Sequence, residues 1–195
     1  MEKHSAMNAL PPDPDGAERL PDTDARGQAQ SGTEPLSPVH GGTEPREGEI
    51  LRRTHSAKET RELGACLAET LKAGDVILLE GPLGAGKSEL ARGIAQGLGI
   101  RETVTSPSFT ILNVYTSGRL PLYHFDWYRL ESAEELYELG MEEYLGGDGV
   151  ALVEWPGRCP EALPGDFRMI EIIPEGEETR LFREYRHASS FHSLS

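Results

Sequence analysis

The sequence predicts an α/β fold in three layers with a mainly parallel β-sheet, preceded by a disordered N-terminal tail. Two features of the 195-residue chain indicate the folded part. Short apolar runs, typical of strands buried on both faces, alternate with stretches of helical spacing. One such run, at residues 76–79, leads directly into a glycine-rich loop and then a helix. The tail is indicated by composition, since the first aromatic residue of the chain is Phe109.

Residues 1–49 have the composition of a disordered segment. They hold seven of the 14 prolines, and ten acidic side chains against four basic ones. So polar a segment buries too little apolar surface to offset the entropy lost on ordering. We therefore expect a disordered tail at 1–49, a folded domain at 50–187 and a frayed C-terminus at 188–195.

The charge and the cysteines narrow the classes of function. The net charge is −14, and no basic stripe of the kind that nucleic-acid binding proteins carry is present. We expect no DNA binding, and contact with RNA only through a partner protein. Cys66 and Cys159 lie far apart in the chain, which indicates neither a zinc site nor a disulfide framework. Cys66 falls on the apolar side of a predicted helix, so we expect it in the core.

The N-terminus does not have the pattern of a secretory signal, and no apolar run is long enough to span a bilayer. We therefore expect a cytoplasmic protein that does not enter a membrane.

The first predicted elements surround the glycine-rich loop. A short strand is expected at 50–54. Ser56 and Glu59 then form a capping-box pattern that opens a helix running to about residue 73. The apolar run at 76–79 predicts a buried strand, and residues 87–98 predict a helix that Gly99 ends.

The second half of the chain again alternates strands and helices. Strands at 108–115 and 120–125 are expected, joined by a turn at Ser117 and Gly118. Another capping box begins at Ser132 and opens a helix toward Leu139. The remaining predicted strands span 150–153, 167–173 and 179–187. This alternation favours a mainly parallel sheet.

The loop at 81–88 reads Gly-Pro-Leu-Gly-Ala-Gly-Lys-Ser and fits the pattern G-x-x-x-x-G-K-[ST]. In such a loop, backbone N–H groups and the following helix N-terminus bind phosphate. Lys87 would reach the β- and γ-phosphates, and the Ser88 hydroxyl would bind Mg²⁺. We therefore expect a P-loop NTPase fold that binds a nucleotide with Mg²⁺. The guanine-reading pattern [NT]-K-x-D does not occur, so the expected nucleotide is ATP. The predicted nucleotide contacts are Gly81, Leu83, Gly84, Ala85, Gly86, Lys87 and Ser88.

Two carboxylates follow predicted buried strands. Asp126 ends the strand at 120–125, and Glu154 ends the strand at 150–153. The carboxyl ends of parallel strands share one edge of a sheet with the P-loop. Either residue alone could be an ordinary strand-end carboxylate or a helix cap. Together, after a P-loop, they favour a pair that handles the metal and the water.

Other polar residues leave their roles open. Ser106, Ser108 and Thr110 occupy the position at which nucleotide switches carry hydroxyls, although an ordinary loop fits the spacing equally well. Arg129 could stabilise phosphate charge or hold the structure together. Trp155 could be a core or an interface residue.

Four segments together resemble the TsaE (YjeE) family. They are the P-loop at 81–88, Val-Thr-Ser-Pro-Ser-Phe-Thr at 104–110, His-Phe-Asp-Trp-Tyr-Arg-Leu at 124–130, and Val-Glu-Trp-Pro at 153–156. The P-loop alone would be weak evidence, but this ordered combination is highly specific. The resemblance covers residues 50–175 approximately.

The resemblance implies a small bacterial ATPase needed to make threonylcarbamoyladenosine beside the anticodon of tRNA. Proteins of this family act with the TsaD–TsaB pair. By the family pattern, Ser88 and Glu154 would bind Mg²⁺, Lys87 would hold phosphate, and Asp126 would assist hydrolysis. Thr60 would lie near the adenine. Hydrolysis would be slow alone and depend on the partners.

The chain departs from the family pattern at two positions of the loop. Pro82 stands where the family usually has Asp, and proline removes a backbone N–H group. Ser88 stands where the family commonly has Thr, which keeps a hydroxyl for Mg²⁺.

Two alternative functions share the P-loop. A nucleoside or small-metabolite kinase would use Asp126 and Arg129 to bind an acceptor, but it should also have an arginine-rich lid. Only scattered arginines such as Arg119 and Arg158 are present. The other alternative is a nucleotide-binding regulatory module with little turnover.

Overall fold

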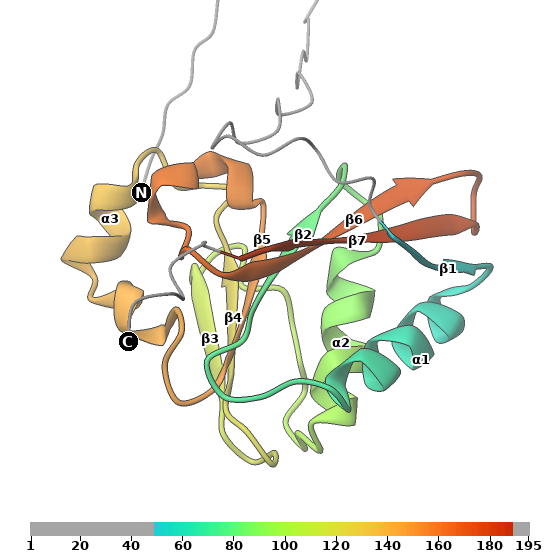
Figure 1. Ribbon diagram of the computed structural model, residues 1–195, viewed down its shortest axis with the longest axis horizontal. Coiled ribbons are helices and arrows are strands. Elements are labelled where there is room, and N and C mark those ends of the chain that lie inside the picture. Colours follow the sequence, from blue (N-terminus) through green and yellow to red (C-terminus); the bar gives the residue numbers. More distant parts are fainter. Residues whose placement is uncertain (1–48, 189–195) are drawn as a thin grey trace, which may run out of the picture. The chain divides into compact units, whose positions relative to one another are not determined.

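The computed structural model describes residues 49–188. The predictions for residues 1–48 and 189–195 lie outside the described residues, and Glu49, the last residue of the predicted tail, begins the first strand. Among the described residues, seven strands form one sheet in the order β1-β7-β6-β2-β5-β4-β3. Helices α1 and α2 cover one face and α3 lies on the other, as Figure 1 shows. The predicted three-layer α/β fold is confirmed.

The strands are β1 (Glu49–Thr54), β2 (Val76–Glu80), β3 (Leu112–Tyr115), β4 (Leu122–Asp126), β5 (Val150–Glu154), β6 (Phe167–Pro174) and β7 (Arg180–His187). The α-helices are α1 (Ala57–Ala68), α2 (Lys87–Gly97) and α3 (Ala133–Glu138). Short 3₁₀ helices are η1 (Met141–Tyr144), η2 (Pro156–Arg158) and η3 (Pro160–Ala162).

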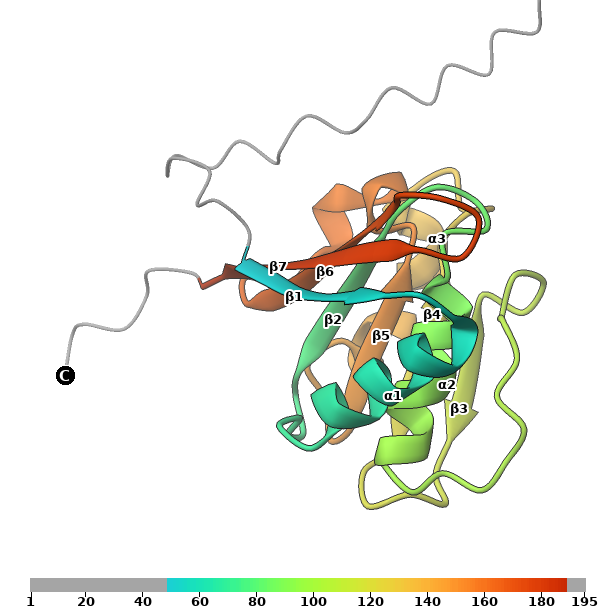
Figure 2. The same ribbon diagram turned by 90° about the vertical axis from the view of Figure 1, so that its right-hand side faces the viewer.

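The sheet is parallel in its centre and antiparallel at its two sides. Strand β2 pairs in parallel with both β5 and β6, and β4 pairs in parallel with β5. Strand β3 runs against β4, β7 runs against β6, and β1 runs against β7. Figure 2 views the face covered by α1 and α2, with β2 and β5 behind them. The carboxyl ends of β2, β5 and β4 therefore lie at one edge of the sheet.

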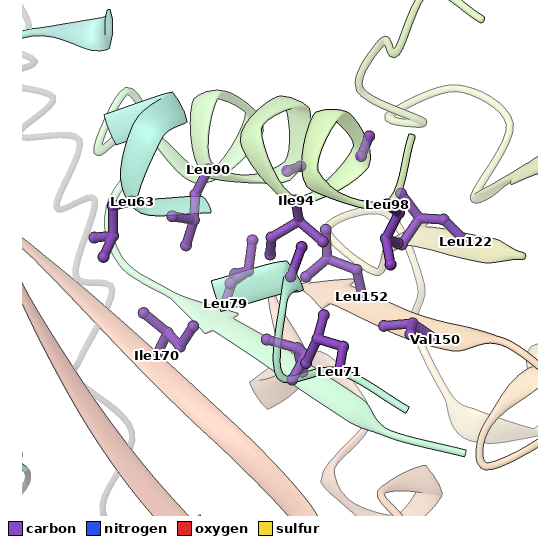
Figure 3. Close-up of a cluster of buried hydrophobic side chains, with 14 of the residues drawn as sticks. Leu63, Leu71, Leu79, Leu90, Ile94, Leu98, Leu122, Val150, Leu152 and Ile170 are labelled. Atoms are coloured by element: carbon purple, nitrogen blue, oxygen red, sulfur yellow. The ribbon is translucent and has the colours of Figure 1, made fainter. Parts of the chain in front are cut away.

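The core has one hydrophobic cluster on each face of the sheet. In β2, Ile77 and Leu79 face the cluster beneath α1 and α2, whereas Val76 and Leu78 face the cluster beneath α3. All four are nearly inaccessible to solvent. Burial on both faces explains why this strand is a continuous apolar run without alternation. Figure 3 shows the first cluster, in which Leu90 and Ile94 of α2 lie over Leu79 and Leu152, with Leu98, the residue after α2, beside them.

Helices α1 and α2 approach each other closely through glycine. A Cβ atom built on Gly93 would lie 2.2 Å from the carbonyl oxygen of Arg61, and one on Gly64 would lie 2.5 Å from that of Leu90. Real Cβ atoms do not come so near. The contact fixes α2, which carries the last residues of the P-loop motif.

Both predicted capping boxes lie at helix starts, but their hydrogen bonds differ from the reciprocal pair that a capping box predicts. The Glu59 N–H donates to the Ser56 hydroxyl over 3.1 Å, as predicted. The Glu59 carboxylate, however, accepts from the N–H of His55, one residue before the N-cap. At α3, Glu135 likewise accepts from the N–H of Glu131, and Ser132 makes no side-chain cap hydrogen bond.

Three local expectations were wrong. The strand expected from residue 108 begins at Leu112, because residues 108–111 form a turn in which Ile111 has φ 64°. The first helix ends at Ala68 rather than near residue 73. Cys66 is exposed, because it lies beside the stripe that Leu63 and Leu67 turn toward the core. Among residues 49–188, no helix is long and apolar enough to cross a membrane.

Candidate nucleotide site

The loop between β2 and α2 depends on glycine at three places. Gly81, Gly84 and Gly86 have φ values of 152°, 77° and 112°. A Cβ atom on Gly81 would also lie 2.7 Å from the carbonyl oxygen of Ile172 in β6. Gly86 is the N-cap residue of α2 and offers no side chain to cap it. The N–H groups of the first turn therefore remain available to an anion.

The other loop residues differ in exposure. Leu83 is 88% exposed at the tip of the loop, and Pro82 is exposed beside it. Ala85 is buried.

The ammonium of Lys87 lies within the loop. Its Nζ donates to the carbonyl oxygens of Gly81 over 2.7 Å and Pro82 over 3.0 Å. It also lies 3.9 Å from the centre of the Trp155 ring. Burial lowers the pKa of this lysine, while the negative charges of Glu154, Glu80 and Asp126 act in the opposite direction. The site thus holds a partly desolvated cation, which interacts more strongly with phosphate than an exposed one.

Ser88 and Glu154 come together from different elements. Ser88 lies in the first turn of α2, and its hydroxyl donates to Oε1 of Glu154 over 3.3 Å. Glu154 ends β5, which pairs with β2 so that Leu79 and Glu154 are neighbours. His124 of β4 is fully buried, and its Nε2 lies 3.0 Å from the same carboxylate oxygen. The carboxylate is therefore fixed from two sides.

Asp126 holds the segment that follows α2 against the end of β4. Its Oδ2 accepts from the hydroxyl of Ser108 over 2.5 Å and from that of Ser106 over 3.3 Å. Its Oδ1 accepts from the N–H of Tyr128 over 3.0 Å. Asp126 also pairs with Glu154 in the sheet register. Both predicted carboxylates thus lie at the sheet edge where the loop begins.

Thr110 and Arg129 hold the turn at residues 108–111 in place. The Thr110 hydroxyl donates to Oδ1 of Asn113 over 2.8 Å. The Nε of Arg129 donates to the carbonyl oxygen of Ser108 over 2.8 Å, and its guanidinium lies 4.7 Å from the centre of the Phe109 ring. In this structure Arg129 supports the turn that carries Ser108.

Trp155 lies beside Lys87 in a strained backbone conformation. It has φ 59°, which is rare for a bulky residue and occurs often at functional sites. Its ring is 5.1 Å from that of Tyr128, whose other neighbour is the guanidinium of Arg158. Trp155 therefore forms one wall around the lysine.

Thr60 is the predicted residue that the structure does not bring to this cluster. It is buried in α1, where its hydroxyl lies 2.9 Å from that of Thr54 and donates to the carbonyl oxygen of Ser56. The contact with Thr54 ties α1 to β1.

Sequence reasoning missed two residues that contact the site. His124 entered the sequence analysis only as the first residue of the segment at 124–130, and its bond to Glu154 depends on the pairing of β4 with β5. Arg180 of β7 donates from Nε to the carbonyl oxygen of Ala85 over 3.2 Å. Arg180 lies 95 residues after Ala85 in the chain, so no local sequence pattern connects it with the loop.

The residues present fit Mg²⁺ bound together with a nucleotide. The Ser88 hydroxyl and the Glu154 carboxylate are hard oxygen donors, which this ion prefers. No group of three or more His, Cys, Asp or Glu side chains within residues 49–188 could hold a metal by itself. Mg²⁺ is usually held by one or two protein groups together with substrate phosphates, so this donor set is sufficient.

Comparison with known proteins gives consistent results. The family model described as "Threonylcarbamoyl adenosine biosynthesis protein TsaE" matches residues 54–182. The chain is 46% identical over 128 residues to the tRNA threonylcarbamoyladenosine biosynthesis protein TsaE of Bacillus subtilis, covering 66% of this chain and 80% of the relative. It is 50% identical over 107 residues to the protein of the same name from a Nostoc species, covering 53% and 65%.

A solved structure is similar as well. The crystal structure of Bacillus subtilis YdiB matches with a TM-score of 0.62 and 39% sequence identity. The match covers 74% of this chain and 89% of that one.

Proposed function

The chain belongs to the TsaE family, and we propose that it is a Mg²⁺-dependent ATPase that acts with TsaD and TsaB in tRNA threonylcarbamoyladenosine biosynthesis. The contact of Ser88 with Glu154 at the start of α2 is the main support for the ATPase part of this proposal. A hydroxyl at the end of a P-loop, facing a strand-end carboxylate, is the arrangement with which P-loop NTPases hold Mg²⁺.

Each group of the site would have a distinct role. The loop N–H groups and Lys87 would hold the phosphates, and Ser88 and Glu154 would hold Mg²⁺. When bound with ATP, Mg²⁺ neutralises charge that develops on the phosphates. Asp126 would accept a hydrogen bond from the attacking water, in place of one of the serine hydroxyls that it now binds.

That exchange suggests how the turn would respond to nucleotide. Ser106 and Ser108 are held by the same oxygen of Asp126, and Arg129 holds the Ser108 carbonyl. A γ-phosphate near Asp126 would compete for these hydroxyls. The turn is therefore suited to a switch-like role, in which its position depends on whether ATP or ADP is bound.

The charge of the chain supports indirect contact with tRNA. With a net charge of −14, the protein would be repelled by the phosphate backbone. TsaD and TsaB would therefore bring the tRNA, and the work would take place in the cytoplasm. The relatives from Bacillus subtilis and a Nostoc species are named for tRNA threonylcarbamoyladenosine biosynthesis.

The two arginines considered for a kinase lid have other partners. Arg119 donates to the carbonyl oxygens of Ala68 and Leu71 at the end of α1. Arg158 lies 5.3 Å from the Tyr128 ring. These contacts give no support for the arginine-rich lid that a kinase should have.

The test is release of phosphate from Mg²⁺ and ATP, by the protein alone and with TsaD–TsaB added. We expect the pair to stimulate release, and Glu154→Gln to reduce the stimulated rate by about 100-fold, because the metal contact is lost. Glu161→Gln, an exposed carboxylate in η3, is the matched control and should leave the rate unchanged.

Three outcomes would refute parts of the proposal. Unimpaired Mg²⁺-dependent turnover in Glu154→Gln would refute the metal assignment. Phosphate transfer to an added nucleoside would favour the kinase. Normal ATP binding with no hydrolysis in either condition would favour a regulatory module.

A further inference from the structure

Arg180 links the far side of the sheet to the phosphate-binding loop. It is the first residue of β7, directly after the turn that follows β6, and it is half-buried. Its Nε donates to the carbonyl oxygen of Ala85 over 3.2 Å, and its Nη1 donates to that of Glu177 over 2.8 Å. The side chain therefore joins the β6–β7 turn to the peptide between Ala85 and Gly86.

This bond determines which way that peptide faces. In a planar trans peptide the C=O and N–H groups point in opposite directions. Because the Ala85 carbonyl points toward β7, the N–H of Gly86 points to the opposite side of the loop. In the sheet, β6 and β7 lie on one side of β2, whereas β5 and β4 lie on the other. The Gly86 N–H is thus directed toward the side that holds Glu154 and Asp126.

Hydrogen bonds within the loop fix the peptides on either side, since the Ala85 N–H donates to the Pro82 carbonyl and the Leu90 N–H donates to that of Gly86. The hydrogen bond to the Ala85 carbonyl comes from Arg180. Gly86 has φ 112°, and glycine adopts positive and negative φ about equally readily. Gly84, two residues earlier, has φ 77° and no atom within 4 Å of where its Cβ would be. The hydrogen bond from Arg180 therefore adds an external restraint to a peptide that has glycine as its second residue.

The guanidinium is not committed to an ion pair. Within residues 49–188, no carboxylate lies within salt-bridge distance of Arg180. The contacts that it makes are with the two backbone carbonyls. Its position is therefore explained by the loop and the turn, rather than by a neighbouring acidic side chain.

We propose that Arg180 is a positioning residue for nucleotide binding, which holds the Ala85 carbonyl outward so that the Gly86 N–H faces the phosphates. This inference rests on the proposed nucleotide-binding function and adds a residue from the other side of the sheet. The effect on nucleotide binding would come from the hydrogen bond of Nε and not from the positive charge of the guanidinium.

Three substitutions separate the hydrogen bond from the charge. Glutamine has an N–H donor at the same number of bonds from the backbone as arginine Nε, but no charge. Lysine keeps the charge and has a methylene group at that place. Alanine removes both. Alanine and glutamine both lose the bond to Glu177, so that bond does not distinguish these two variants.

The experiment is calorimetric titration of the full-length protein with ADP, and separately with pyrophosphate, in the presence of Mg²⁺. We expect Arg180→Ala and Arg180→Lys to bind both ligands about tenfold more weakly than the unmodified protein. Arg180→Gln should bind within about twofold of it. Thermal unfolding of each variant gives the folded fraction, and the comparison of glutamine with lysine remains decisive if alanine fails to fold.

Other results would overturn the inference. Binding restored by lysine and not by glutamine would mean that the charge acts on the phosphates directly. Unimpaired binding by Arg180→Ala would mean that the loop keeps its orientation alone. If the unmodified protein bound neither ADP nor pyrophosphate, the proposed nucleotide-binding function itself would fail.

Discussion

Substituting Gly93 by alanine tests whether close packing of α1 on α2 holds the loop in place. The new Cβ atom would lie 2.2 Å from the carbonyl oxygen of Arg61, and 2.8 Å from two more backbone atoms of that residue. These are backbone atoms and cannot turn aside as a flexible side chain can. The helices must therefore move apart by about 0.8 Å to bring the contact to the 3.0 Å below which real Cβ atoms essentially never come.

The size of the effect follows from two opposing terms. Overpacking costs about 1–3 kcal/mol, and the upper part of that range, about 2–3 kcal/mol, applies here because the contact is with backbone atoms. Replacing glycine by alanine within a helix recovers about 1 kcal/mol of helix propensity. We therefore expect the free energy of unfolding to fall by about 1–2 kcal/mol. Because Lys87 and Ser88 lie in the first turn of the displaced helix, ADP binding should weaken as well.

Urea denaturation measures the loss of stability as a lower midpoint with an unchanged slope. Gly176→Ala is the matched control, since Gly176 lies in the β6–β7 turn with no atom near the added methyl group. It should change stability by less than about 0.5 kcal/mol. A Gly93→Ala protein as stable as the unmodified one, or more stable, would refute the close approach of the two helices.

Three further predictions concern single side chains. Lys87→Ala should weaken ADP binding at least about tenfold in calorimetry, because a partly desolvated ammonium is lost; affinity within twofold would contradict this. Cys66 is exposed and should react at once with a thiol reagent, whereas Cys159 should react only after unfolding. Burial raises the pKa of the Cys159 thiol to about 11. The folded state therefore keeps a proton that the unfolded state loses, and stability should fall as pH rises from about 9 to 11, less so in Cys159→Ala. Equal reactivity of both thiols would refute the burial.

Much of the fold could be predicted from local patterns in the sequence. The run at 76–79 indicated a strand buried on both faces, and both of its faces are covered. The strands that end in Asp126 and Glu154 were expected to meet the loop at one sheet edge, and the parallel pairing of β4, β5 and β2 brings them there. The roles of these residues in hydrolysis stay predictions.

The wrong local expectations have a common physical cause. Apolar spacing indicates an apolar stripe on a helix but not how much of that stripe the rest of the protein covers. Cys66 was therefore expected in the core, whereas it is exposed to solvent. The turn at 108–111 is held by Asp126 and Arg129, which lie elsewhere in the chain. Short-range propensity contains no information about such partners.

The sequence by itself determined the glycine-rich loop at 81–88, because the glycines allow its backbone conformation and the lysine and serine lie within the same eight neighbouring residues. It also determined the alternation of strands and helices, which depends on local periodicity. Only the tertiary structure decided what supports the loop. The order of strands brings His124 to Glu154 and Arg180 to Ala85. Such contacts depend on which strands become neighbours, and that choice is made by packing the whole sheet rather than by any one segment.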